Sequence, residues 1–303
     1  IRQHRQHGQH SQTLGVYQSI LDSGYCEIKN PYVSKKYYQK FYNCFNRLIE
    51  LISKDNAFAK TITEIEQDFL ALYSNTFCGA PTGYRDCTQK STKKDQKIYF
   101  QYSSEYYALI QEKYPSILNK FDFFRIFLNH LDYIDKKAKI ILNEAINRLD
   151  MSVPNLKKSL FSERKELTVI IKVLRYVGNE KLCTSPHYDK CGLTLVLDNN
   201  DVVNDRFILG PYMDPFDGSK LVAPKRQFDK QESVTSSLLF AGACLKKVNV
   251  ALNPTPHAAL PANTPFRYSM IAFCLVPNIN TTDVQTTIVD KNEFLNNRID
   301  HLT

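Results

Sequence analysis

The sequence predicts an α+β fold in which helices come first, strands follow and a final helix closes the β domain. In the first half, apolar residues recur at the spacing of a helix. From about residue 154 onward, β-branched and apolar runs alternate with clusters of Gly, Pro, Asn and Asp, as in a β sandwich or barrel. We therefore expect a disordered tail at 1–13, a mainly helical region at 14–153 and a β domain with a C-terminal helix at 154–303.

Two stretches of the first half carry a strong helical pattern. Ser34 can cap the first helix, because its hydroxyl can accept hydrogen bonds from the unpaired N–H groups of the first turn. The apolar positions that follow it are Tyr38, Phe41, Phe45, Leu48, Ile49 and Ile52. Those of the second helix are Ile134, Ala138, Ile141, Leu142, Ala145 and Leu149. Residues 291–302 have the same character, which predicts the C-terminal helix.

Four runs of the second half predict strands, at 167–177, 193–197, 236–243 and 268–276. Between the second and third runs lies a long segment, 199–232, that is rich in Gly, Pro and Asp and carries Tyr212, Met213 and Phe216. Long connections in compact domains tend to be functional or disordered. We therefore weigh two interpretations of this segment: a lid over a substrate, and an ordinary exposed hairpin.

Composition excludes several classes of protein. With 303 residues, of which 43% are apolar, the chain can bury a large core, and no apolar run is long enough to span a membrane. A net charge of +8 is modest for this length, so nucleic-acid binding is not expected. None of the eight cysteines forms a C-x-x-C pair, and the first residues lack the apolar stretch of a secretory signal. Reduced thiols in the cytoplasm are the simplest expectation.

Three potential metal ligands lie beside the predicted strands. His187 and Asp189 precede the strand at 193–197, and residues two apart on an extended chain point the same way. His257 follows the strand at 236–243. Two imidazoles and one carboxylate form a facial triad that leaves coordination positions open on iron(II) for oxygen and an organic ligand. The pattern therefore predicts an Fe(II) site made of His187, Asp189 and His257.

A second pair of residues suits the carboxylate of an organic ligand. Arg267 follows His257 by 10 residues, and Ser269 lies two positions further along the same predicted strand. Their side chains face the same side of a strand. A guanidinium beside a hydroxyl can hold a carboxylate through charge-assisted hydrogen bonds. We therefore expect Arg267 and Ser269 to bind the carboxylate of a substrate or co-substrate that reaches the metal.

The order His187-x-Asp189, His257 and Arg267-x-Ser269 resembles the isopenicillin N synthase-like family of iron(II)- and 2-oxoglutarate-dependent dioxygenases. The segments around these residues are similar too. They are Ile20–Cys26, Gly83–Arg85 with Lys94 and Asp95, Val173–Tyr176, His187–Val196 and Leu238–Leu245. The resemblance extends over residues 14–303 and is clearest over 167–275.

The resemblance implies a fold and a chemistry. It implies a double-stranded β-helix, or jelly roll, at 154–303, and an oxidoreductase that binds Fe(II) at His187, Asp189 and His257. It also implies that 2-oxoglutarate is the co-substrate, held by Arg267 and Ser269, and that a small organic molecule is oxidised with molecular oxygen. Tyr176 is a candidate contact for either the substrate or the co-substrate.

Departures from the family pattern leave alternatives open. Members that use 2-oxoglutarate often carry Asn where this chain has Leu174, so an oxidase of the same fold that needs no 2-oxo acid is one alternative. A nucleic-acid demethylase is another, although the second Arg of such enzymes falls in the region that Phe273 occupies here. The third is a non-enzymatic binding module, against which the intact triad argues.

Overall fold

The computed structural model describes residues 15–21, 24–74, 82–88, 97–161, 166–177, 184–199, 207–209, 236–248, 252–259, 265–277, 279 and 284. The predicted tail at 1–13 and the predicted helix at 291–302 lie outside the described residues. So does the segment 199–232, apart from residues 199 and 207–209.

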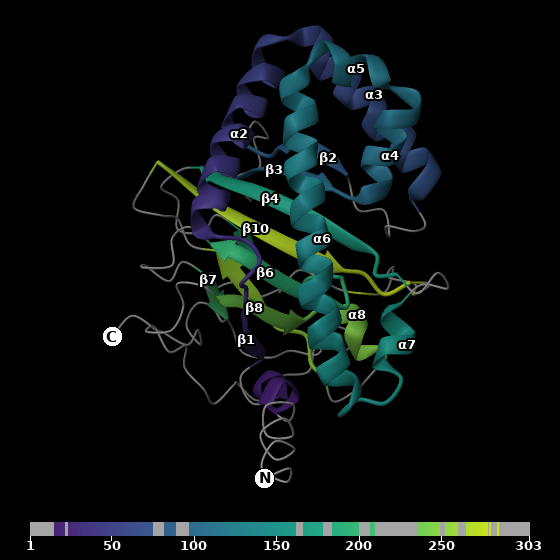
Figure 1. The fold of residues 1–303 in the computed structure, drawn as a ribbon. Helices are drawn as coiled ribbons and strands as arrows, with labels where there is room; N and C mark the ends of the chain where they lie inside the picture. The colour runs from purple at the N-terminus through teal and green to yellow at the C-terminus, as the bar shows by residue number, and fades with distance from the viewer. Residues whose placement is uncertain are drawn as a thin grey trace, which may run out of the picture.

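Strands from both halves of the chain form two antiparallel sheets (Figure 1). The larger has seven strands in the order β1-β8-β6-β10-β4-β3-β2, and the smaller has three in the order β5-β9-β7. The strands of the larger sheet are β1 (Tyr25–Lys29), β2 (Gly83–Asp86), β3 (Lys97–Tyr102), β4 (Val169–Val177), β6 (Leu193–Asn199), β8 (Ser236–Ala241) and β10 (Phe266–Cys274). Those of the smaller sheet are β5 (Thr184–His187), β7 (Phe207–Leu209) and β9 (His257–Ala259).

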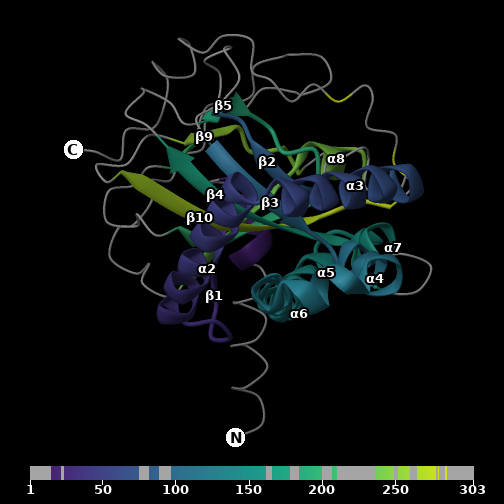
Figure 2. The same cartoon turned by 90° about the horizontal axis from the view of Figure 1, so that it is seen from above.

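The long helix α6 (Asp122–Asp150) packs across one face of the seven-stranded sheet, and β5 and β9 lie on the opposite side (Figure 2). The helices are α2 (Lys35–Lys54), α3 (Asn56–Tyr73), α4 (Ser104–Lys113), α5 (Pro115–Lys120), α6 (Asp122–Asp150), α7 (Leu156–Leu160) and α8 (Ala243–Lys246). The described residues contain no helix that is long and apolar enough to cross a membrane.

The two predicted helices of the first half are confirmed as α2 and α6. Ser34 caps α2, since its side chain accepts a hydrogen bond from the backbone N–H of Tyr37. Of the predicted apolar stripe of α2, Ile52 is only partly buried and the other members are buried. All six predicted stripe residues of α6 are buried against the sheet and its neighbours. Burial of these stripes attaches the helices to the sheet.

The four predicted strands are confirmed as β4, β6, β8 and β10, each within two residues of its expected bounds. The structure adds six strands that the sequence analysis did not identify: β1, β2 and β3 in the mainly helical half, and β5, β7 and β9 of the smaller sheet. β1 pairs with β8 and β3 with β4, so the two halves share one sheet. The division at residues 153 and 154 remains a prediction.

Side chains of the central strands point alternately to the two faces of the sheet, so that one face packs in the hydrophobic core and the other lines a pocket. On β10, Met270 and Ala272 are fully buried in the core, whereas Arg267, Ser269, Ile271 and Phe273 line the pocket on the opposite face. Residues two apart share a face of a strand, so these four side chains emerge together. The pocket therefore lies between the larger sheet and the strands β5 and β9.

Candidate metal centre

The pairing of β5 with β9 brings two distant histidines together. His187, the last residue of β5, is the register partner of His257, the first residue of β9. Residues directly opposite each other in an antiparallel pair have neighbouring side chains. The two imidazole rings accordingly lie with their centroids 4.3 Å apart and their planes at 55°. Strand pairing thus supplies two of the three predicted ligands.

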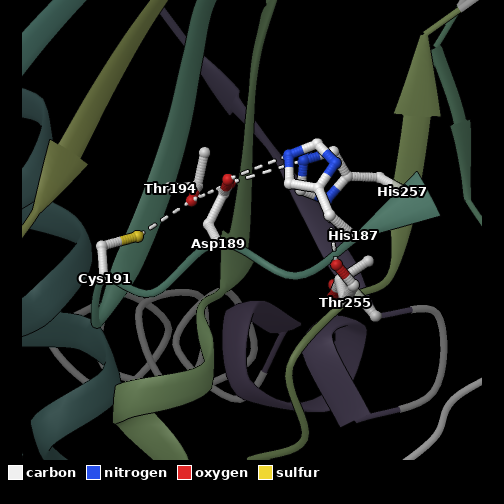
Figure 3. Close-up of polar contacts among 7 residues, drawn as sticks. His187, Asp189, Cys191, Thr194, Thr255 and His257 are labelled. Carbon is white, nitrogen blue, oxygen red and sulfur yellow. Dashed lines mark hydrogen bonds and ion pairs between the residues drawn. The ribbon is translucent and has the colours of Figure 1, made fainter. Parts of the chain in front are cut away.

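Asp189 completes the predicted triad. It lies two residues beyond β5, and its two carboxylate oxygens face the two histidines (Figure 3). Oδ1 is 3.5 Å from Nε2 of His187, and Oδ2 is 3.5 Å from Nε2 of His257. One ligand atom from each of the three residues lies within 4.8 Å of the others. Among the described residues, this is the only such group of three or more His, Cys, Asp or Glu side chains.

The backbone around Asp189 is held by the turn that leads into α8. The N–H of Ala243 donates a 2.7 Å hydrogen bond to the carbonyl of Asp189, and the N–H of Gly242 donates to the carbonyl of Gly192. Gly242 approaches so closely that an added Cβ would lie 2.1 Å from the carbonyl oxygen of Cys191. Only glycine fits here without displacing the backbone that carries the ligand.

Side-chain hydrogen bonds orient two of the ligands (Figure 3). Nδ1 of His257 lies 3.0 Å from the carbonyl oxygen of Thr255, which suits an Nδ1–H donor and leaves the lone pair of Nε2 facing Asp189. The hydroxyl of Thr194 donates a 2.7 Å hydrogen bond to Oδ2 of Asp189. The thiol of Cys191 contacts this hydroxyl at 3.1 Å, so it lies behind the ligands and is not one of them.

Electrostatics favour the protonation states that a metal requires. Burial raises the pKa of Asp189, but the two imidazoles and the hydrogen bond from Thr194 outweigh it and hold this pKa below its ordinary value. Burial lowers the pKa of His257 to about 4, against the opposing effect of Asp189. An ionised carboxylate beside a neutral imidazole is the ligand form that binds a divalent metal.

The donor set fits iron(II). Two imidazole nitrogens and one carboxylate lie close together, and this is the donor set of non-haem iron centres with open coordination positions. His130, in contrast, lies on α6, where its Nδ1 is 2.7 Å from the hydroxyl of Tyr37. It therefore belongs to the helical layer and is not among the residues that line the pocket.

The pocket beside the triad is also lined by the predicted carboxylate-binding residues. Arg267 is 2% exposed, and its guanidinium carbon lies 4.2 Å from the ring centroid of Tyr176, its register partner on β4. Ser269 follows on the same face, and its hydroxyl donates a 3.3 Å hydrogen bond to the carbonyl of Asp198. His187, Asp189 and His257 line the same pocket. The sheet therefore gathers all six predicted site residues around one cavity.

Two lysines of this pocket were missed by sequence reasoning. Lys97 on β3 is the register partner of Tyr176, and Lys172 lies on β4 opposite Ile271. Both line the cavity. Lys172 sits within an otherwise apolar run, Val169–Leu174, and this interruption is the signal that could have found it. Lys97 lay in a strand that the sequence analysis did not identify.

Comparison with known proteins supports the fold. No protein-family model matches the chain, and no curated protein matches its sequence. A Neurospora crassa protein solved with alpha-KG (2-oxoglutarate) and thymine is similar with a TM-score of 0.54 at 14% identity, over 93% of this chain and 88% of that one. A dioxygenase for auxin oxidation from Arabidopsis thaliana, in complex with 2-oxoglutarate, is similar with a TM-score of 0.53 at 16% identity, over 90% of each chain. At these identities the likeness establishes a shared fold.

Proposed function

We propose that this protein is an iron(II)-dependent oxygenase that uses 2-oxoglutarate and molecular oxygen to oxidise a small organic substrate. The observation that carries the proposal is the convergence of His187, Asp189 and His257 at one end of a pocket that also contains the buried Arg267. The fold shared with two proteins solved with 2-oxoglutarate supports it. Within this proposal, the two facing sheets are the walls of a jelly roll.

The residues of the pocket would have separate roles in binding the metal and the co-substrate. His187, Asp189 and His257 would hold Fe(II), which supplies the activation of oxygen when bound. Arg267 would bind the far carboxylate of 2-oxoglutarate, and the ring of Tyr176 keeps its guanidinium in place. A rotation of the Ser269 side chain would redirect its hydroxyl from the carbonyl of Asp198 to the same carboxylate. The pocket walls would exclude water from the reacting centre.

Apolar side chains line the rest of the pocket, which suits a small organic substrate. Val196, Phe240, Ile271 and Phe273 also line the cavity. Pockets for small molecules combine such apolar walls with a few polar groups that fix orientation. One of the two similar structures was solved with thymine and the other is named for auxin oxidation, and both compounds are small organic molecules. Cytoplasmic location and the absence of nucleic-acid binding remain predictions.

One observation favours a second candidate, an oxidase of the same fold that needs no 2-oxo acid. Leu174 is 3% exposed and lines the pocket between Lys172 and Tyr176, where many users of 2-oxoglutarate carry a polar amide. In this case Arg267 would bind a carboxylate of the substrate itself.

Binding measurements under nitrogen separate the two candidates. Purified protein is titrated first with iron(II) and then with 2-oxoglutarate by calorimetry. Binding of both, followed by release of succinate when oxygen and a substrate are admitted, supports the main proposal. Binding of iron(II) without 2-oxoglutarate supports the oxidase. Failure to bind iron(II) overturns both.

A further inference from the structure

We propose that Asn46 of helix α2 positions Arg267 for the binding of a carboxylate, although the two residues lie on opposite faces of the sheet. Asn46 is a positioning residue in this proposal, since it is not among the residues that line the pocket. The inference rests on the proposed function and deepens it, because it concerns the site that would hold the far carboxylate of 2-oxoglutarate.

Asn46 is a polar residue on the sheet-facing side of α2. It lies four residues after Tyr42 and three before Ile49, both of which are buried, and residues at this spacing share one face of a helix. Asparagine is a weak helix former, because its side chain competes for backbone hydrogen bonds. Here its Oδ1 instead accepts two hydrogen bonds from the sheet, one of 2.9 Å from the hydroxyl of Tyr268 and one of 3.1 Å from Nη1 of Arg175.

The two donors lie directly beside the predicted carboxylate-binding residues. Tyr268 on β10 is the register partner of Arg175 on β4, and the next pair along the same two strands is Arg267 and Tyr176. Successive residues of a strand point to opposite faces of the sheet, so the first pair faces α2 and the second pair faces the pocket. A single oxygen of Asn46 therefore ties β4 to β10 one residue away from Arg267.

The pair that contains Arg267 lies near the end of the sheet. β10 begins at Phe266, and β4 ends at Val177. Within the described residues, the pairing of β10 with β6 begins only at Ser269. The ends of such ladders open at a low free-energy cost, because few neighbours hold them. The hydrogen bonds to Asn46 would limit the motion of the strand end that carries Arg267.

A second residue of α2 holds the same end of the sheet. The ring of Tyr42 stacks on that of Tyr268, with the centroids 4.7 Å apart and the planes at 18°. Its hydroxyl donates a 2.6 Å hydrogen bond to Oδ2 of Asp198 on β6, and the backbone carbonyl of Asp198 accepts the hydroxyl of Ser269. Helix α2 thus contacts the three adjacent strands β4, β10 and β6 next to the predicted carboxylate site.

The position of Arg267 matters because its interaction with a carboxylate is directional. Its guanidinium carbon lies 4.2 Å from the ring centroid of Tyr176, which sets the plane of the group. A paired hydrogen bond from a guanidinium to a carboxylate weakens steeply when the N–H groups no longer point at the oxygens. Loss of the contacts at Asn46 would therefore weaken a ligand that carries the far carboxylate more than a ligand that lacks it.

The test compares two oxo acids that differ at the far end. Iron-loaded protein is titrated under nitrogen with 2-oxoglutarate and with 2-oxopentanoate, which has a methyl group in place of the far carboxylate. In Asn46→Leu, which removes the acceptor, we expect the preference for 2-oxoglutarate to fall about fivefold or more. Asn46→Asp, which keeps an acceptor oxygen, should retain the preference. So should Asn43→Leu, the same change at an exposed position of α2.

A second variant and a second measurement complete the test. Tyr268→Phe removes the hydroxyl that donates to Asn46 and should also lower the preference, so the test stands even when Asn46→Leu does not fold. Crystal structures without ligands provide the second measurement. The guanidinium of Arg267 should lie on the ring of Tyr176 in the wild type and should be displaced from it in both variants.

Three outcomes overturn the proposal. The first is an unchanged preference for 2-oxoglutarate in Asn46→Leu and Tyr268→Phe. The second is an equal loss of affinity for both oxo acids, because Asn46 then has only a general structural role. The third is an Arg267 that stays on Tyr176 in both variants. When the wild type binds no iron(II) or no 2-oxoglutarate, the proposed function fails instead, and the crystal structures alone decide whether Asn46 positions Arg267.

Discussion

The hydroxyl of Thr194 donates a 2.7 Å hydrogen bond to Oδ2 of Asp189, the carboxylate oxygen that also lies 3.5 Å from Nε2 of His257. Thr194 is fully buried on β6, whereas Asp189 lies in the connection before that strand. The hydrogen bond therefore ties the ligand to the rigid sheet. It fixes the orientation of the carboxylate relative to both imidazoles.

Thr194→Val should weaken iron(II) binding by roughly 10-fold to 100-fold, the usual effect of removing a group that orients a metal ligand. Valine matches the shape of threonine, so the packing of β6 should change little. Anaerobic titration with iron(II) measures the affinity, and Thr194→Ser, which keeps the hydroxyl, should bind nearly as well as the wild type. Equal affinities for the valine and serine variants would show that the hydrogen bond does not position Asp189.

Alanine at any one of the three ligands should abolish iron(II) binding. The side chains of His187, Asp189 and His257 approach one another from two strands and a loop, and no fourth ligand of these types lies within reach in the described part of the chain. The measurement is an anaerobic titration with each of the three variants. His130→Ala, on α6 outside the pocket, is the matched control and should bind normally. Wild-type affinity in two of the three ligand variants would contradict the assignment.

Arg267→Ala should weaken 2-oxoglutarate binding by about 3–5 kcal/mol, the scale for removing one partner of a buried ion pair. Iron(II) affinity should be retained, because Arg267 is not a member of the triad. Calorimetric titration of the metal-free protein gives the affinity for iron(II), and titration of the iron-loaded protein gives the affinity for 2-oxoglutarate. Arg267→Lys should recover part of the affinity, since an ammonium keeps the charge and loses the two-pronged geometry. An unchanged affinity for 2-oxoglutarate in the alanine variant would remove Arg267 from the site.

Much of the metal centre could be predicted from the sequence because its signals are local. His187 and Asp189 are two residues apart, and Arg267 and Ser269 share one face of a single strand. The convergence of His257 on the other ligands is different, since it depends on the pairing of β5 with β9. The sequence suggested that contact only indirectly, through the types of ligand and through the order of motifs in the family that the chain resembles.

The strands of the first half escaped prediction for a physical reason. β1 pairs with β8 through partners such as Tyr25 and Phe240, which are far apart in the sequence. β2 has only four residues, too few for alternation to stand out from the surrounding pattern. Short strands of this kind are stabilised by their neighbours in the sheet rather than by local propensity. The position of Lys97 in the pocket therefore became visible only with the structure.

A buried carboxylate in the helical layer leads to a last prediction, about stability. Asp135 on α6 is 1% exposed, and its Oδ2 pairs with Nζ of Lys139 at 2.7 Å. Its other oxygen, Oδ1, is buried without a hydrogen bond. Burial raises the pKa of Asp135 from 3.8 to about 6, although Lys139 opposes the shift. Near neutral pH the fold therefore contains a carboxylate that would be more stable protonated.

Relative to Asp135→Asn, the wild type should accordingly lose stability as pH rises from about 4 to about 6. In this window the unfolded chain has released the proton of Asp135 and the folded chain still holds it, so each increase in pH favours unfolding. This relative loss in the free energy of unfolding should approach about 3 kcal/mol. Lys139→Met should enlarge this loss of stability, because the variant lacks the ammonium that favours the ionised carboxylate of Asp135. Urea unfolding at pH 4, 5, 6 and 7 gives the free energies of unfolding for all three proteins. Parallel curves for the wild type and Asp135→Asn would show that Asp135 titrates alike in the folded and unfolded chains.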